Sequence, residues 1–409
     1  MPEEYPTIRP TVRMDLEFYP LEHGGKQFVL IRDHLGLVQE GKAVEAPLYR
    51  FMALLNGTRT MRDLQTELIR QRGGVLVGTE EIQNLLALLD DSFLLNSERY
   101  RKARDRIIDD FARKPTRPSS HAGRAYPDHP LELRKRLEEI LDSGPPATSL
   151  PDGKVVALVS PHMDLSVGSR VYGTAYQMVR GAKASRVVIL GVGHQMGEGL
   201  FCLTEKDFET PLGVVECDRA LVGRLREAGG DDITANDFPH RSEHSIEFQL
   251  IFLQHQLSGQ AFRIIPILCG FLGSAMADFS RSRYLDTAAP FLEVLQDLRE
   301  RDSNTLLVAG VDLSHVGPKF GDHLPARHLE SRSTAHDRAL LQALSERDAE
   351  GFWEESRRVG DAYHVCGFSA LACLLEILPP CTGHVLDYRI WHEAPTNSSV
   401  SFGAVVFTA

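Results

Sequence analysis

The sequence predicts an α/β protein with a mainly parallel sheet and helices on both faces, preceded by a small winged-helix-like α+β domain. In the second part of the chain, continuous runs of Val, Ile and Leu alternate with helical segments. This alternation is typical of parallel strands that are buried on both faces. In the first part, two extended segments are followed by three short helical patterns. At 409 residues, the chain is also too long for one average domain.

The first domain is expected to span residues 1–99. Its extended segments are MDLEFYPL and QFVLIRD, which two glycines separate. Thr60, with Asp63 three residues later, and Thr79 are expected to cap the second and third helices. The three helices are expected in PLYRFMALL, MRDLQTELIRQR and EEIQNLLALLDDSFLL.

A linker is expected at residues 100–121, where a charged segment expected to be helical passes into Pro, Ser and Gly without apolar periodicity. The larger domain, residues 122–409, then carries the alternating pattern. Its last two apolar runs, HVLDYRIWHEA and SSVSFGAVVFT, are close together and are expected to extend the sheet as an antiparallel pair. Because few contacts cross such a linker, we expect the N-terminal domain to bind a peptide or partner and to be dispensable for folding of residues 122–409.

Composition and motifs argue against several classes of function. The net charge of −11 disfavours a nucleic-acid-binding surface as the main role. Neither a membrane span nor a secretory signal is predicted, because no apolar run approaches eighteen residues and the start, MPEEYPTIRP, lacks a signal pattern. The six cysteines lack CxxC spacing, which predicts free thiols in a reducing cytoplasm. The run GVGHQMG is not a dinucleotide loop, because its glycines follow GxGxxxG and no helical pattern comes after it.

Three apolar runs end on a histidine: VVALVSPH at His162, VVILGVGH at His194 and LLVAGVDLSH at His315. Ligands of open α/β sheets bind outside the carboxyl ends of the strands, so these imidazoles are expected to converge on one site. One such histidine alone would be interpreted as lying at the edge of the core, but three together favour a site. Asp164 and Asp312 are near His162 and His315 in the sequence and are expected to orient them or stabilise their charge.

The segment SEHSIEFQL is expected to begin a helix with Ser242 as its cap. It places Glu243 and Glu247 four residues apart on one helix face, with His244 beside them. These side chains are candidates for the same site. An ordinary first helical turn is the alternative interpretation, since acidic residues are favoured there.

Cys366 precedes Gly367 at the start of the apolar helix in HVCGFSALACLLEIL. A cysteine at a helix N-terminus has a lowered pKa and is available as a thiolate, either as a nucleophile or as a soft metal ligand. A small buried hydrophobic residue is the alternative interpretation of a free cysteine. We adopt that alternative for Cys373, which lies within the apolar face.

From AYPDHPLELRKRLEEIL onward, the chain resembles the Memo family, which is called AmmeMemoRadiSam system protein B in prokaryotes. The resemblance covers residues 122–409 and rests on short blocks in the family's order: SPHMD, VVILGVGHQ, FETPLGVVECD, SEHSIEFQL, IIPILCG, VDLSHVG, VCGFSA and SSVSF. It implies a fold similar to LigB-type class III extradiol dioxygenases, in which two histidines and a carboxylate bind non-haem iron. It also implies a radical-SAM enzyme and an AMMECR1-like protein as partners.

For this chain, the resemblance implies that His162, His194 and Cys366 bind a metal ion, with iron as the first choice and copper or zinc as alternatives. Two imidazoles and one anionic ligand leave coordination positions open for oxygen or substrate. A thiolate in place of the carboxylate favours softer or redox-active metals.

The resemblance further places His315 in the position of an acid/base histidine. The other side chains that it implies at this site are Asp312, Glu243 and His244. Two positions depart from the family pattern: Gln249 stands where another histidine is frequent, and Val316 where an aromatic residue is common. These departures bear on the recognition of a substrate or partner and leave the ligand set intact.

Residues 15–97 resemble the PqqD-like peptide-recognition modules in LLNGTRTMRDLQTELIRQRGG and EEIQNLLALLDDSFLL. This implies a peptide-binding domain, and a helical packing domain without a ligand is the alternative. Two functions of the whole chain remain open. One is a metal-dependent, dioxygenase-like redox enzyme that acts with a radical-SAM partner on a peptide or small aromatic substrate. The other is a non-catalytic protein that uses the same site to hold a peptide or carry a metal.

Overall fold

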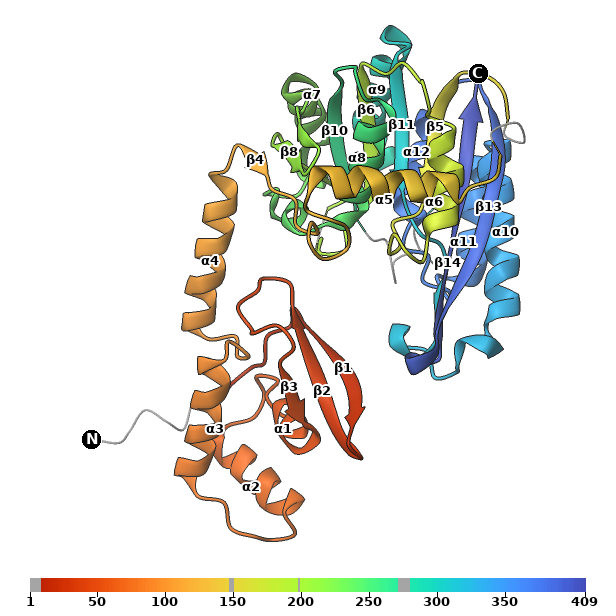
Figure 1. Cartoon of the computed structure of the whole chain (residues 1–409). Helices are drawn as coiled ribbons and strands as arrows, with labels where there is room; N and C mark the ends of the chain where they lie inside the picture. Colours follow the sequence, from red (N-terminus) through yellow and green to blue (C-terminus); the bar gives the residue numbers. More distant parts are fainter. Residues whose placement is uncertain (1–8, 147–150, 198, 271–279) are drawn as a thin grey trace. The chain divides into compact units, whose positions relative to one another are not determined.

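The computed structural model describes residues 9–146, 151–197, 199–270 and 280–409. The chain divides into two compact units, Met1–Arg113 and Lys114–Ala409 (Figure 1). Most of the N-terminal segment MPEEYPTIRP lies outside the described residues. Among the described residues, no helix has both the length and the apolar character needed to cross a bilayer.

The first unit contains the extended pair and the three helices that the sequence predicts, together with a short third strand. The Thr60 side chain and Asp63 form the expected capping box. Thr79 is not a cap, because it is the first residue of its helix and the cap position is Gly78. The unit is therefore a small α+β domain. Its antiparallel sheet has the order β1 (Leu16–His23), β2 (Lys26–Asp33), β3 (Ala43–Glu45), and its first helices are α1 (Ala46–Met52), α2 (Met61–Gln71) and α3 (Thr79–Asp91).

The residues expected as a linker, 100–121, contain the boundary between the two units and are themselves structured. Helix α4 (Glu98–Ala112) occupies most of them and belongs to the first unit. The rest opens the second unit, where β4 (Thr116–Arg117) pairs with β8 (Asp207–Thr210). Arg117 is fully buried there, so the segment rich in Pro and Ser is part of the larger fold.

The large sheet of the second unit is mixed. Its four central strands run parallel, while the strands at its two edges are antiparallel to their neighbours. The two last strands form the expected antiparallel pair. The strands of the large sheet follow the order β12 (His315–Val316), β14 (Ser398–Thr408), β5 (Val155–Ser160), β11 (Thr305–Gly310), β6 (Arg186–Val192), β10 (Arg263–Cys269) and β7 (Phe201–Leu203). Strand β13 (Thr382–Glu393) also pairs with β14. Strand β9 (Gly213–Val215) pairs with β8 in a smaller sheet.

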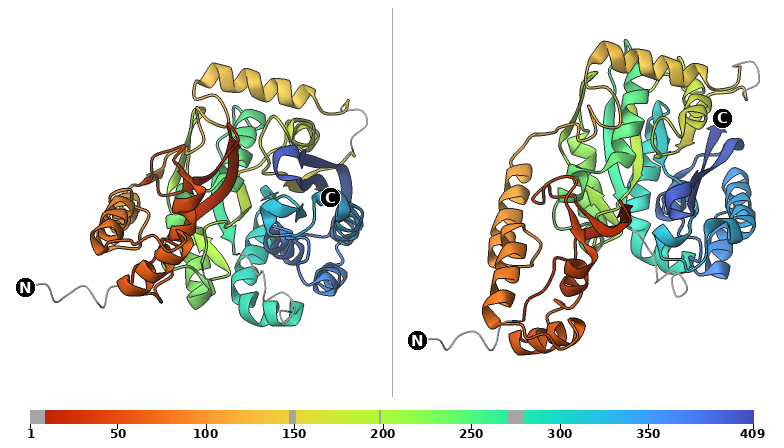
Figure 2. Two further views of the ribbon diagram at one scale, coloured as in Figure 1. Left: turned by 90° about the horizontal axis from the view of Figure 1, so that it is seen from below. Right: turned by 60° about the horizontal axis from the view of Figure 1, so that its bottom comes forward.

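Helices cover both faces of this sheet, as the apolar runs predict (Figures 1 and 2). Successive residues of a strand point to opposite faces, so Val187 and Ile189 pack into one core and Val188 and Leu190 into the other. The first core includes α5 (Pro130–Asp142), α6 (Ser169–Gln177) and α8 (His244–Gln256). The second includes α7 (Arg219–Gly229), α9 (Arg281–Arg301), α10 (Glu330–Glu346), α11 (Ala349–Val359) and α12 (Phe368–Ile377).

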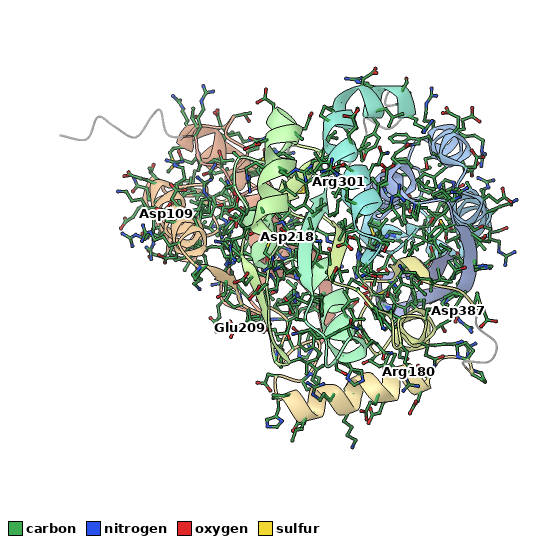
Figure 3. All side chains as sticks on the ribbon, turned by 90° about the horizontal axis from the view of Figure 1, so that it is seen from above. Asp109, Arg180, Glu209, Asp218, Arg301 and Asp387 are labelled. Carbon is green, nitrogen blue, oxygen red and sulfur yellow. The ribbon has the colours of Figure 1, made fainter. Side chains whose placement is uncertain are left out.

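Many charged side chains of the second unit are exposed at its surface. Arg180, Glu209 and Arg301 are examples (Figure 3). The buried charges of the second unit are therefore informative, because a buried ionised group is retained only with compensating partners. Several of them lie at the carboxyl ends of the parallel strands.

Candidate functional site

Two of the three predicted histidines meet at the carboxyl ends of the central strands. His162 lies two residues after β5 and His194 two residues after β6, and both strands pair with β11. The centroids of the two rings are 5.0 Å apart. His244, the first residue of α8, is 5.0 Å from each of them. One ring nitrogen of each histidine lies within 4.8 Å of the others, which is close enough for one metal ion.

His162 presents its Nε2 atom to this site. Its Nδ1 is 3.0 Å from the carbonyl oxygen of Gly310, which can only accept, so Nδ1 carries the proton. Nε2 is then left with a lone pair. Burial lowers the pKa of His162 to about 3, so the ring is neutral, which is the form that binds metals.

Glu243 orients His194. The carboxylate oxygens of Glu243 lie 3.0 and 3.1 Å from Nδ1 of His194, which leaves Nε2 of that ring toward the site. Glu243 also accepts hydrogen bonds from the backbone N–H groups of His244 and Ser245, and is therefore the N-cap of α8 in place of the expected Ser242. A carboxylate bound to the far nitrogen is typical of metal-binding histidines, because it fixes the ring and raises its basicity.

His194 and Glu243 also shift each other's pKa. Burial alone would lower the pKa of His194, but Glu243 and Cys366 raise it well above the ordinary value. Burial likewise would raise the pKa of Glu243, yet His194 holds it well below. His194 and Glu243 therefore form an ion pair in the metal-free protein. A metal ion at Nε2 would take the place of the proton there.

Cys366 enters the site two residues before α12. Its Sγ is 3.5 Å from Nε2 of His162 and 3.6 Å from the carbonyl oxygen of Asp312. This close approach requires glycine next to it, because a Cβ at Gly367 would lie only 2.7 Å from the same carbonyl oxygen. The expected lowering of the thiol pKa is wrong: burial raises it, although hydrogen bonding to His194 opposes the rise. The helix N-terminus is outweighed because the thiol is removed from water.

Asp312 contacts His162 directly, whereas the sequence predicted that this carboxylate would orient His315. Its carboxylate accepts from the backbone N–H of His162 at 3.1 Å and lies 3.5 Å from Nε2 of that ring. Burial raises the pKa of Asp312 to about 6. Asp164 does not orient His162, because its carboxylate accepts from the backbone of Ser166 and Val167 and closes a turn.

His315 is displaced from the strand end at which the sequence predicts it. Strand β11 ends at Gly310, and His315 begins the short strand β12. Its Nδ1 is 2.9 Å from the carbonyl oxygen of Leu313, so Nδ1 is the donor and Nε2 the acceptor. Burial lowers its pKa to about 4, although Asp312 opposes this. His315 is therefore a neutral base, and it is not among the three histidines whose ring nitrogens lie within 4.8 Å of one another.

The sequence interpretation missed a buried polar network beside the cluster. The carboxylate of Glu247 accepts from the Arg117 guanidinium, from the backbone N–H groups of Ser120 and His121, and from the Tyr126 hydroxyl. Glu247 and Arg117 are both fully buried. Glu243 and Glu247 thus do not act on one ligand, contrary to the expected shared face. These hydrogen bonds hold residues 117–126 against the N-terminal half of α8. The sequence gives no local signal for this contact, because the segment is rich in Pro, Ser and Gly.

Gln249 supports the site from behind. Its amide nitrogen donates to the carbonyl oxygen of Pro161 at 2.9 Å, and its amide oxygen accepts from the Tyr176 hydroxyl at 2.7 Å. Pro161 precedes His162, so Gln249 holds the backbone that carries a candidate ligand. Val316, the other position that departs from the family pattern, is buried.

The available donors suit a transition-metal ion. The bare Nε2 of His162, the oriented Nε2 of His194, a third imidazole and a thiol are the kinds of ligand that iron, copper and zinc accept. The site differs from a calcium or magnesium site, which requires oxygen ligands.

A family model described as Memo-like protein matches residues 117–406. The chain belongs to the Memo-like family. The matched region begins at Arg117, inside the segment that α8 holds.

Relatives of this Memo-like chain occur in bacteria and animals. A MEMO1 family protein of Aquifex aeolicus is 33% identical over 98% of this chain and 100% of that protein. A MEMO1 family protein of Thermus thermophilus is 30% identical over 85% of this chain and 99% of that protein. The memo-1 homolog of Caenorhabditis elegans is 26% identical over 71% of this chain and 82% of that protein. Similarity to the Aquifex protein therefore extends through both units.

Proposed function

We propose that this Memo-like chain binds a transition-metal ion through His162, His194 and Cys366 and acts as a dioxygenase-like redox enzyme. The observation that carries the proposal is the approach of the Cys366 Sγ to the bare Nε2 of His162, beside a histidine that Glu243 orients. Iron is the first choice, with copper and zinc as alternatives. Such an ion supplies Lewis-acid or electron-transfer chemistry when bound.

Alanine substitution of any one of the three proposed ligands is expected to remove most of the bound metal. Each substitution leaves only two protein ligands, which weakens a site that already has open positions. The measurement is the metal content of protein purified without oxygen and loaded with iron(II). His244→Ala is expected to retain metal, although its ring nitrogen is also near the other two.

Two cysteines provide controls for this experiment. Cys202 and Cys373 are fully buried in the apolar cores, so Cys202→Ala and Cys373→Ala should leave the metal content unchanged. Loss of metal from His244→Ala together with retention by Cys366→Ala would contradict the proposed set. The metal site would then consist of three histidines, His162, His194 and His244.

His315 is proposed as the group that takes a proton from the substrate. Its Nδ1 hydrogen bond to Leu313 leaves Nε2 as an acceptor, and its low pKa keeps it neutral. His315→Ala is expected to retain metal and to lower the rate of turnover by about 10²–10⁴-fold. Loss of metal in this variant would reassign His315 as a ligand.

A metal carrier is the second candidate function. It is favoured by His194, whose side chain is 36% exposed and so accessible for metal exchange with another protein. Oxygen consumption by iron-loaded protein distinguishes the two functions: turnover with any substrate supports the enzyme, and tightly bound iron without turnover supports the carrier. As the family resemblance implies, we propose a radical-SAM enzyme and an AMMECR1-like protein as partners in either case, with the N-terminal unit as the peptide-binding part.

A further inference from the structure

His121 is a fourth imidazole at the edge of the histidine cluster. Its ring centroid is 5.7 Å from that of His244 and 5.6 Å from that of Phe248. The side chain is 25% exposed, so one edge of the ring is open. It reaches the site from the segment 117–126, whereas the three histidines of the cluster come from strand ends and from α8.

Hydrogen bonds determine which nitrogen of His121 carries the proton. Nδ1 is 2.8 Å from Ser120 Oγ, which is itself 3.0 Å from a carboxylate oxygen of Glu247 and 3.0 Å from Nη2 of Arg117. Burial would raise the pKa of Glu247, but Arg117 keeps it well below the ordinary value, so the carboxylate is ionised and only accepts. The Ser120 hydroxyl proton therefore points to Glu247.

The Ser120 oxygen then has two lone pairs left. One lone pair accepts from Arg117, whose guanidinium can only donate, and the other accepts from Nδ1–H of His121. In the neutral imidazole, Nε2 of His121 consequently has a bare lone pair. Within the described part of the chain, no side chain or backbone group donates to it.

The orientation of this ring is fixed before any ligand binds. The backbone N–H of His121 donates to Glu247 at 2.9 Å, and Ser120 is held by the same carboxylate through its backbone and its hydroxyl. A buried ionised carboxylate is costly unless it is fully paired. Here its partners hold an imidazole acceptor in place beside His244, and a preorganised acceptor binds with a smaller entropy cost.

We propose that His121 is a ligand-contacting residue of the site, whose Nε2 accepts a hydrogen bond from the molecule that binds beside His244. The inference rests on the proposed function in one respect: the metal ion anchors the other end of that molecule. The ligand class is a small molecule with oxygen atoms for the metal and a separate O–H or N–H group for His121. Phe248 offers an apolar face next to both histidines.

The test uses the full chain loaded with cobalt(II), whose visible spectrum reports ligand binding, and salicylhydroxamate as the probe. This probe has two oxygen atoms for a metal and both N–H and O–H groups. His121→Ala is expected to keep its full metal content and to bind the probe about three- to tenfold more weakly, the range for one lost hydrogen bond. His121→Gln should recover most of the affinity, because its amide oxygen can accept at the place of Nε2.

His129 provides the matched control. It is an exposed histidine at the N-cap position of α5 and makes no side-chain cap hydrogen bond, so His129→Ala should bind metal and probe as the wild type does. Equal probe affinity of wild type and His121→Ala would overturn this inference alone, and so would loss of metal from His121→Ala. A wild-type protein that holds cobalt but does not bind the probe would overturn both this inference and the open metal site of the proposed function.

Discussion

A fragment of residues 114–409 is expected to fold with the stability of the large unit in the full chain, whereas a fragment of residues 122–409 should lose about 3–5 kcal/mol of its free energy of unfolding. The two fragments differ only in the segment that contains Arg117, Ser120 and His121. Without it, the Glu247 carboxylate stays buried in α8 and loses most of its hydrogen-bond donors. Leaving a buried charge without partners costs far more free energy than the intact ion pair contributes to stability.

Tryptophan fluorescence during urea denaturation measures this difference. The chain has two tryptophans, Trp353 and Trp391, and both lie in the large unit. Within fragment 114–409, Arg117→Met should reproduce much of the loss. Adding Glu247→Leu should recover part of it, because removing both partners leaves no unpaired buried charge. Fragments 114–409 and 122–409 that unfold at the same urea concentration would show that residues 114–121 contribute little, as a linker would.

Glu243→Ala is expected to weaken metal binding by about 10–100-fold, although Glu243 is not itself a proposed ligand. The substitution removes the acceptor that fixes Nδ1 of His194, so the ring can rotate and its Nε2 becomes less basic. Glu243→Gln should have a smaller effect, since its amide oxygen can still accept from Nδ1–H. Metal affinity is measured by competition with a chromophoric chelator.

The loss of a helix cap must be separated from the loss of histidine orientation. Asp348 is a suitable control, because its carboxylate caps α11 through the backbone N–H of Gly351, and no contact joins it to the histidine cluster among the described residues. Asp348→Ala should lower the free energy of unfolding by about 1 kcal/mol, as loss of a cap does, and leave metal affinity unchanged. Equal metal affinity of Glu243→Ala and wild type would show that His194 keeps its orientation without the carboxylate.

The elements of the fold were largely predictable from local pattern. Continuous apolar runs mark the buried parallel strands, and the close spacing of the last two runs marks an antiparallel pair. The position of His162 and His194 follows from the same signal, because the length of an apolar run sets where the strand ends, and parallel strands end at one edge. The predicted position of His315 was wrong, because β11 ends five residues before it.

The partners of the polar groups were decided only by the tertiary structure. Glu243 and Glu247 look equivalent on one helix, yet the first orients His194 and the second holds Arg117, which is 130 residues away in the sequence. Burial, which only the tertiary structure shows, likewise reverses the expected pKa shift of Cys366. The sequence by itself determined the apolar strands and the family and indicated three candidate ligands, because hydrophobic period and short motifs are local. It did not determine which buried charges pair, because the low-dielectric interior enforces that pairing between segments that only the folded chain brings together.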